Sequence, residues 1–137
     1  MNHYLYMALL MIPAGLLSTM NVWANSWSDV RLSLNDAYMI ALMTGWMLLF
    51  MGLGDKNTKV FLVGSAVVIL AFAAIRFQVG ITENQFLLGM IPHHSMAVLM
   101  SKQLQSKPNQ IGGLLENIIK SQSEEIQWMK SYVAAAP

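Results

Sequence analysis

The chain contains no cysteine, and only 11% of its 137 residues are charged. The absence of cysteine excludes disulfides, thiolate zinc sites, iron–sulfur clusters and a cysteine nucleophile. A soluble domain is about 25% charged, so a soluble globule of this composition would lack polar surface. A net charge of +1 provides no basic footprint for nucleic acid. Hydrophobic residues make up 55% of the chain, which favours a membrane protein over a soluble or disordered one.

Long runs without charge occupy the first part of the sequence. A spanning helix needs about 20 largely apolar residues. The runs therefore predict a membrane domain over residues 1–80, with transmembrane helices near 4–23, 36–54 and 59–79 and the lipid bilayer as partner. Arg76, near the end of the third helix, is expected to anchor at the interface.

The loop charges predict the orientation. Lys56 and Lys59 lie between the second and third helices, and positive charge favours the cytoplasmic side. The N-terminus is then inside, and everything after Gly80 is outside. We predict a bacterial inner (cytoplasmic) membrane protein whose C-terminal domain faces the periplasmic or extracellular side. Cleavage of residues 1–24 as a signal peptide stays open, although the start of the chain lacks lysine and arginine.

Residues 81–137 have a different composition, with four lysines and four glutamates spread along them. This indicates an extracytoplasmic hairpin of two amphipathic helices, from about Thr82 to Gln105 and from about Gln110 to Val133. Thr82-x-x-Gln85 is a plausible capping box at the start of the first helix. The fold class predicted for the chain is all-α.

Residues with metal chemistry gather on the first helix of this hairpin. At helical steps of three and four residues, one broad face of this helix carries Met90, His93, His94, Ala97 and Met100. Pro92 is expected to kink the helix and re-aim the histidines. Imidazole beside thioether sulfur suits copper, especially Cu(I). The alternative interpretation is a surface histidine pair with methionines as core filler.

The second helix carries Gln122, Glu125 and Met129 at helical steps, on a stripe that partly faces the histidines. The two segments, Met90-Ile-Pro-His93-His94 and the later Gln122-x-x-Glu125-Ile126-x-x-Met129, resemble the CopM-like family, a domain-of-unknown-function family. The resemblance covers about residues 82–133. It implies a ferritin-like helical fold outside the cytoplasm and a role in copper binding and tolerance.

The resemblance also assigns roles to residues. Metal ligation is carried over to Met90, His93, His94 and Met129. Gln122 and Glu125 match as residues that orient the ligands or pack the helices. Met96, which departs from the family pattern, and Met100 are possible additional ligands.

Three functions fit the sequence. The first is a membrane-anchored protein that buffers or hands on Cu(I). The others are a structural or accessory module without metal, and a small cytochrome with haem held by His93 or His94 and Met129. An enzyme is not expected, because Glu-x-x-His pairs and a credible Ser–His–Asp set are missing.

Two further patterns lead to expectations about the membrane helices and the hairpin. Methionines recur every four residues at Met39, Met43, Met47 and Met51, with Met7 and Met11 repeating the spacing. They form either a Cu(I) path or ordinary apolar packing. A domain of about 55 residues has a marginal core. We therefore expect a homodimer through the hairpin, with packing of the hairpin onto its own membrane helices as the rival.

Overall fold

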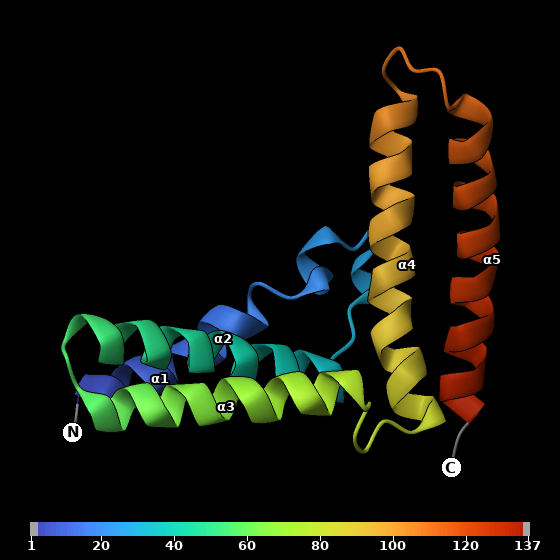
Figure 1. Ribbon diagram of the computed structural model, residues 1–137. Helices are drawn as coiled ribbons and strands as arrows, with labels where there is room; N and C mark the ends of the chain where they lie inside the picture. Colours follow the sequence, from blue (N-terminus) through green and yellow to red (C-terminus); the bar gives the residue numbers. More distant parts are fainter. Residues whose placement is uncertain (1–2, 136–137) are drawn as a thin grey trace. The chain divides into compact units, whose positions relative to one another are not determined.

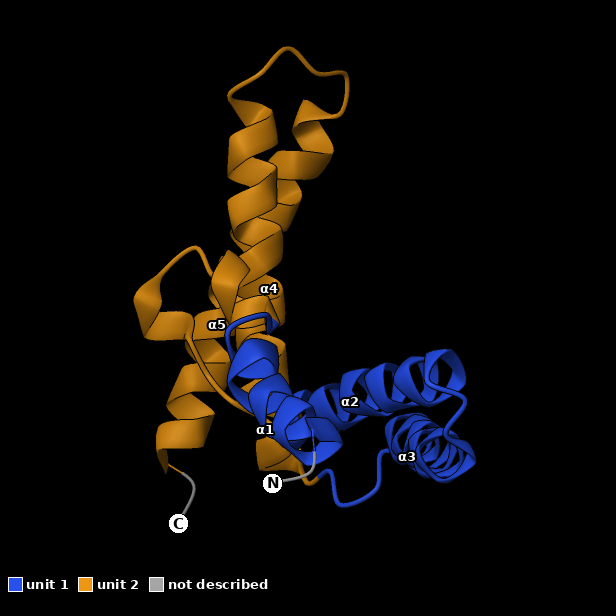
Figure 2. Cartoon of the chain, turned by 90° about the vertical axis from the view of Figure 1, so that its left-hand side faces the viewer, with its two compact units in different colours: residues 1–19, 34–81 blue, residues 20–33, 82–137 orange. Residues whose placement is uncertain are grey.

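The computed structural model describes residues 3–135, and these residues contain helices and no strand. The helices are α1 (His3–Leu16), α2 (Leu34–Gly54), α3 (Thr58–Arg76), α4 (Glu83–Gln105) and α5 (Gly112–Ala135), with short 3-10 turns at Met20–Trp23 and Trp27–Asp29 (Figure 1). The predicted all-α class is confirmed. The chain divides into two compact units, residues 1–19 with 34–81 and residues 20–33 with 82–137 (Figure 2).

The first unit contains α1, α2 and α3. Three segments are long and apolar enough to cross a membrane: His3–Trp23, Leu34–Gly54 and Thr58–Arg76. They agree with the predicted spans to within a few residues. The α-helical part of the first ends early, at Leu16. There the Ser18 hydroxyl donates to the Ala14 carbonyl (2.7 Å), a side-chain bond that competes with the helical ladder.

Helices α2 and α3 form an antiparallel pair with glycines at the contact (Figure 1). A Cβ atom added at Gly64 would lie 2.3 Å from the backbone nitrogen of Leu49, so the two backbones touch there. Small residues allow this close approach, which is how helices associate where the surroundings are apolar. The turn between them places Lys56 at φ 54°, and Asn57 caps α3 by accepting a bond from the Val60 amide.

The second unit is built on the hairpin of α4 and α5. Its core is a cluster of Leu87, Ile91, Val98, Ile126 and Met129, with Met90 and Val133 packed against it. The start of α4 follows the predicted cap, because the Thr82 hydroxyl accepts a bond from the Gln85 amide (3.3 Å). Pro92 is buried inside α4, and α5 begins two residues later than predicted.

Residues 20–33 belong to this second unit as well. The sequence predicts all of them within the membrane domain, with residues 20–23 at the end of the first span and the rest in the loop that follows it. In the structure this 20–33 segment folds against α4 through its two 3-10 turns. The hairpin is therefore covered by a segment that is distant from it in sequence.

Candidate functional site

His94 is held at both ring nitrogens. Nδ1 lies 2.9 Å from the main-chain oxygen of Met90, and Nε2 lies 3.0 Å from Oε2 of Glu125. The His94 side chain is 14% exposed, whereas that of Glu125 is 55% exposed. A carbonyl oxygen only accepts hydrogen bonds, so Nδ1 carries the proton. The ring is therefore oriented by α4 itself, with Nε2 directed at α5.

The contact between Nε2 and Glu125 has a chemical consequence. Nitrogen and carboxylate at 3.0 Å attract each other only if a proton or another cation lies between them. A histidine that binds a metal through one nitrogen usually donates its other N–H to a carbonyl or carboxylate. His94 has that arrangement, with Met90 as the acceptor and Nε2 as the nitrogen available after loss of a proton.

The register of the hairpin brings the methionines beside this pair. Because α4 and α5 are antiparallel, the contact of His94 with Glu125 places Met90, one turn earlier, opposite Met129, one turn later. Met129 is 4% exposed in the core cluster, and Met90 packs against that cluster. Met90 is thus one turn from His94 on α4, and Met129 is one turn from Glu125 on the facing helix.

His93 is placed differently from His94. It is exposed, and its ring meets that of His94 edge-on, with centroids 5.9 Å apart and planes at 89°. Adjacent residues point about 100° apart around a helix, so only one of the two can face the seam. The structure places His94 at the seam and His93 outside it.

Gln122 lies one turn before Glu125 on α5. Its Oε1 is buried and has no hydrogen-bond partner among the described residues. An unpaired buried acceptor is costly, so this oxygen could gain stability by accepting from a donor or a cation.

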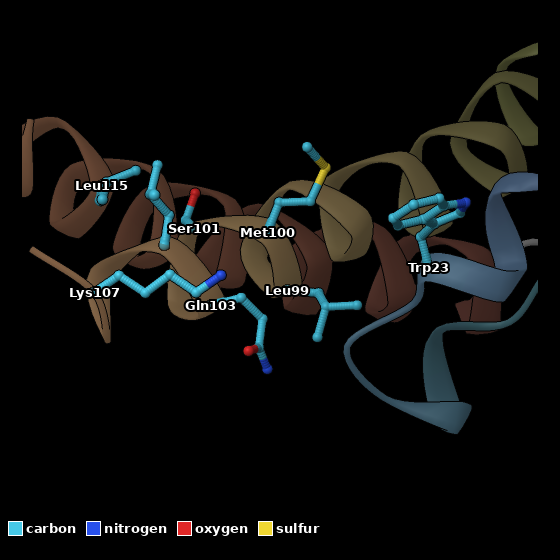
Figure 3. Close-up of a pocket in the computed structure, with 8 residues that line it drawn as sticks. Trp23, Leu99, Met100, Ser101, Gln103, Lys107 and Leu115 are labelled. Carbon is cyan, nitrogen blue, oxygen red and sulfur yellow. The ribbon is translucent and has the colours of Figure 1, made fainter. Parts of the chain in front are cut away.

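Met96 and Met100, the two possible additional ligands, lie elsewhere. Met96 is two residues after His94, about 200° around the helix, and so on the opposite side of α4. Met100 is 53% exposed and lines a groove of about 440 Å³ with Trp23 and Leu99 at the outer side of α4 (Figure 3).

Residues 3–135 contain no group of three or more histidine, aspartate or glutamate side chains that could hold a metal ion. The donors that the seam offers besides His94 and Glu125 are the sulfur atoms of Met90 and Met129 and the Gln122 oxygen. In α2, Met39 and Met43 are exposed, whereas Met47 and Met51 are partly buried.

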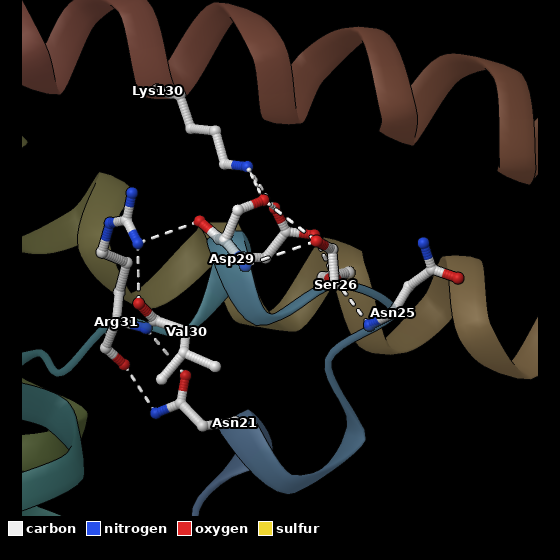
Figure 4. Close-up of polar contacts among 9 residues, drawn as sticks. Asn21, Asn25, Ser26, Asp29, Val30, Arg31 and Lys130 are labelled. Carbon is white, nitrogen blue, oxygen red and sulfur yellow. Dashed lines mark hydrogen bonds and ion pairs between the residues drawn. The ribbon is translucent and has the colours of Figure 1, made fainter.

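A second polar cluster joins the 20–33 segment to the hairpin (Figure 4). Asp29 is 5% exposed, accepts a hydrogen bond from the Ser95 hydroxyl (2.6 Å) and forms an ion pair with Lys130. The Ser95 hydroxyl oxygen in turn accepts a bond from the main-chain N–H of Asn25 (2.8 Å), and Lys130 also donates to the Ser28 hydroxyl (2.9 Å). We call these five residues the Asp29 clasp.

The environment of Asp29 changes its acidity. Burial raises the pKa of this carboxyl, but the bonds from Lys130, Ser95 and Ser28 and the charge of Lys130 outweigh burial and hold the pKa below its usual value. Sequence reasoning missed the clasp, because Ser28 and Lys130 are 102 residues apart and no local pattern relates them.

Comparison with known proteins supplies a family and no activity. Residues 71–133, which include α4 and most of α5, match a domain of unknown function, DUF305. The chain is 44% identical over 135 residues to "Uncharacterized protein L153" of Acanthamoeba polyphaga mimivirus, covering 93% of this chain and 88% of that protein. No solved structure matches the chain. The domain-of-unknown-function assignment is thus confirmed: the chain belongs to the same family as the mimivirus protein and carries a DUF305 domain.

Proposed function

We propose that this protein is a membrane-anchored copper-binding protein that holds Cu(I) at the seam between α4 and α5. The observation that carries the proposal is the orientation of His94. Its Nδ1 is held by the Met90 carbonyl, so its Nε2 is the nitrogen presented to α5 beside Glu125. The role is binding, as a buffer or donor of Cu(I), and not catalysis.

The donor set favours copper over harder ions. Neutral imidazole and thioether sulfur are borderline and soft ligands, which select Cu(I), whereas Mg²⁺ and Ca²⁺ prefer oxygen. His94 would supply Nε2, and Met90 and Met129 would supply sulfur from facing positions. The resemblance to the CopM-like family, which includes these residues, supports the same assignment and adds a role in copper tolerance.

Glu125 gives the site a dependence on protons. A metal at Nε2 has to displace any proton that His94 shares there with the Glu125 carboxylate. Copper binding is therefore expected to release a proton and to weaken as the medium becomes acidic, because a protonated imidazole cannot ligate. Glu125 is then free to accept a hydrogen bond or to compensate the charge.

The orientation in the membrane has support from the fold. Residues 24–33, which follow the first candidate span, belong to the same compact unit as the hairpin, and this supports a position for both on one side of the membrane. Between them lie α2 and α3, two candidate spans that take the chain across and back. With the loop of Lys56 and Lys59 in the cytoplasm, that shared side is the extracytoplasmic one.

A Cu(I) competition assay on the full chain in detergent tests the proposal. His94→Ala should weaken Cu(I) binding at least tenfold, and His93→Ala, which changes an exposed neighbour outside the seam, is its matched control. The double histidine variant should lose high-affinity binding. The pair Met43→Leu and Met47→Leu should bind as the parent does, since these methionines are in α2.

Two outcomes would overturn the assignment. If His94→Ala binds Cu(I) as tightly as the parent, the site is not at the seam, and a module without metal is the better description. If the purified protein is red with a Soret band, the haem alternative replaces copper.

A further inference from the structure

Two stripes of side chains run along the hairpin at alternating steps of four and three residues. On α4 the stripe consists of Phe86, Met90, His93, Ala97, Met100 and Leu104. On α5 it consists of Leu114, Ile118, Ser121, Glu125, Trp128 and Tyr132. This is the spacing of a helix that packs along its length against another helix.

Both stripes border the same side of the seam. On that side the helices are joined by His94 with Glu125 and by the Tyr132 hydroxyl, which donates to Glu83 (2.9 Å). On the other side the seam is covered by the 20–33 segment, where Asp29 bridges Ser95 and Lys130 (Figure 4). Trp23 of the same segment borders the groove that Met100 and Leu104 also line, so it marks one edge of the side with the two stripes. We call the side with the two stripes the open face.

The apolar exposure of the two helices is confined to this face. α4 and α5 leave six large apolar side chains exposed, and all six lie on the stripes: Phe86 (51%), Met100 (53%), Leu104 (40%), Leu114 (56%), Trp128 (61%) and Tyr132 (41%). At about 200 Å² for a fully exposed large side chain, they present roughly 600 Å². A standard protein interface buries about 800 Å² per partner, so these six side chains supply about three quarters of that area.

Charged side chains are few on the open face. Among the twelve stripe positions Glu125 is the one acidic or basic residue besides His93, and the Glu83 carboxylate lies beside Tyr132 on the same side. The lysine of the clasp, Lys130, lies on the covered side, and Glu124 and Lys120 lie on the back of α5. Covering the open face therefore removes few charges from water, so the cost of desolvation is small.

We propose that the open face is the surface through which two copies of this chain associate, hairpin to hairpin, as a four-helix bundle. A two-helix hairpin has half the helices of such a bundle. Its other side is already covered by its own 20–33 segment. The small residues Ala97 and Ser121 lie near the middle of the stripes, where close approach of two helices needs them.

Single cysteines test the surface directly, because the chain has none of its own. Ser121→Cys places a thiol on the open face, and Gln127→Cys places one on the back of the same helix, where the native residue is equally exposed. With full-length, metal-free protein in nanodiscs and a short bis-maleimide, Ser121→Cys should be trapped mainly as a dimer and Gln127→Cys as a monomer. Equal trapping of both variants, or of neither, overturns the proposal.

A charge on the open face provides the second measurement. Leu114→Glu should raise the dissociation constant of the dimer at least tenfold in sedimentation equilibrium, with helix content unchanged because the side chain is exposed. Lys120→Glu, on the back of α5, should leave it unchanged. A monomer for the parent chain, with Ser121→Cys shielded from maleimide, would assign the face to lipid or to the chain's own membrane helices instead.

The surface does not depend on the copper assignment. Association is measured without metal, so a dimer that fails to bind Cu(I) would refute the proposed function alone. A monomer that binds Cu(I) tightly would refute the interface alone.

Discussion

Removing the carboxylate of Asp29 should detach the 20–33 segment from the hairpin. This carboxylate is buried, and it pairs with Lys130 and accepts from Ser95. A hydrogen bond to a charged group contributes about 1.5–3 kcal/mol to stability. The variant loses the bonds from Lys130 and Ser95, but it also no longer pays the desolvation cost of a buried carboxylate, which offsets part of that loss. For Asp29→Ala we expect docking to weaken by about 2–3 kcal/mol, which is about a 30- to 160-fold rise in the detached population.

Removing the other partner should be more damaging. In Lys130→Ala the Asp29 carboxylate stays buried without its cation, whereas the Lys130 ammonium left by Asp29→Ala can reach water, since its side chain is 20% exposed. Breaking a buried pair in this way costs about 3 kcal/mol or more. The double variant should lose less than the sum of the single losses, because the two residues act through one interaction.

Trypsin reports the detachment. Arg31 is the sole lysine or arginine in the first 55 residues, and it is tied into the 20–33 segment. Its main-chain N–H donates to Asn21 Oδ1 (2.8 Å) and its guanidinium donates to the Val30 carbonyl (2.7 Å). If reattachment is fast, the cleavage rate at Arg31 follows the detached population. A change of less than threefold in both variants, or an equal rise at Lys56, would refute the reasoning.

The same contact predicts a pH dependence. The pKa of Asp29 is lowered in the folded protein, so its contribution to stability is fully present above the unfolded value of about 3.9 and is lost as pH falls through the lower folded value. Carboxyl-carbon NMR should give Asp29 a midpoint below that of a free aspartate. In Lys130→Ala the midpoint should rise, because burial then acts with less opposition. An unchanged midpoint in that variant would mean that Lys130 does not hold the carboxylate.

Three other predictions concern separate parts of the chain. Gly64→Ala should destabilise the α2–α3 pair in a thermal unfolding assay in detergent, because the new Cβ would lie 2.3 Å from the Leu49 nitrogen, whereas Gly54→Ala, with nothing within 4 Å, should have little effect. The bond to Glu83 raises the pKa of Tyr132, so its tyrosinate absorbance should appear at lower pH in Glu83→Gln; any stability from this bond is present below the ordinary tyrosine value and lost as pH rises through the folded one. A phosphatase fused after the last residue should be active if the hairpin is extracytoplasmic, and a fluorescent cytoplasmic fusion without phosphatase activity would contradict the orientation.

Local patterns were enough to predict the helices. An uncharged run of about 20 residues has few stable alternatives to a spanning helix, since its backbone groups must be satisfied internally. A local pattern also predicted the start of α4, because the spacing of Thr82 and Gln85 indicates a cap and Thr82 caps the helix in the structure. The helical spacing within each helix also predicted that Met90 and Met129 lie on facing stripes. In the structure Met129 is in the core cluster and Met90 packs against it.

The sequence by itself therefore determined the all-α class, the three candidate spans and the hairpin, and it indicated the residue types that we propose as metal ligands. Only the tertiary structure decided that His94 and not His93 faces the seam, and that the 20–33 segment belongs with the hairpin. Those outcomes depend on which side of each helix packs against another segment. They also depend on the pairing of Asp29 with Lys130, which are far apart in the sequence. Helical periodicity is a property of neighbouring residues, whereas a buried ion pair is selected by the packing of the whole unit.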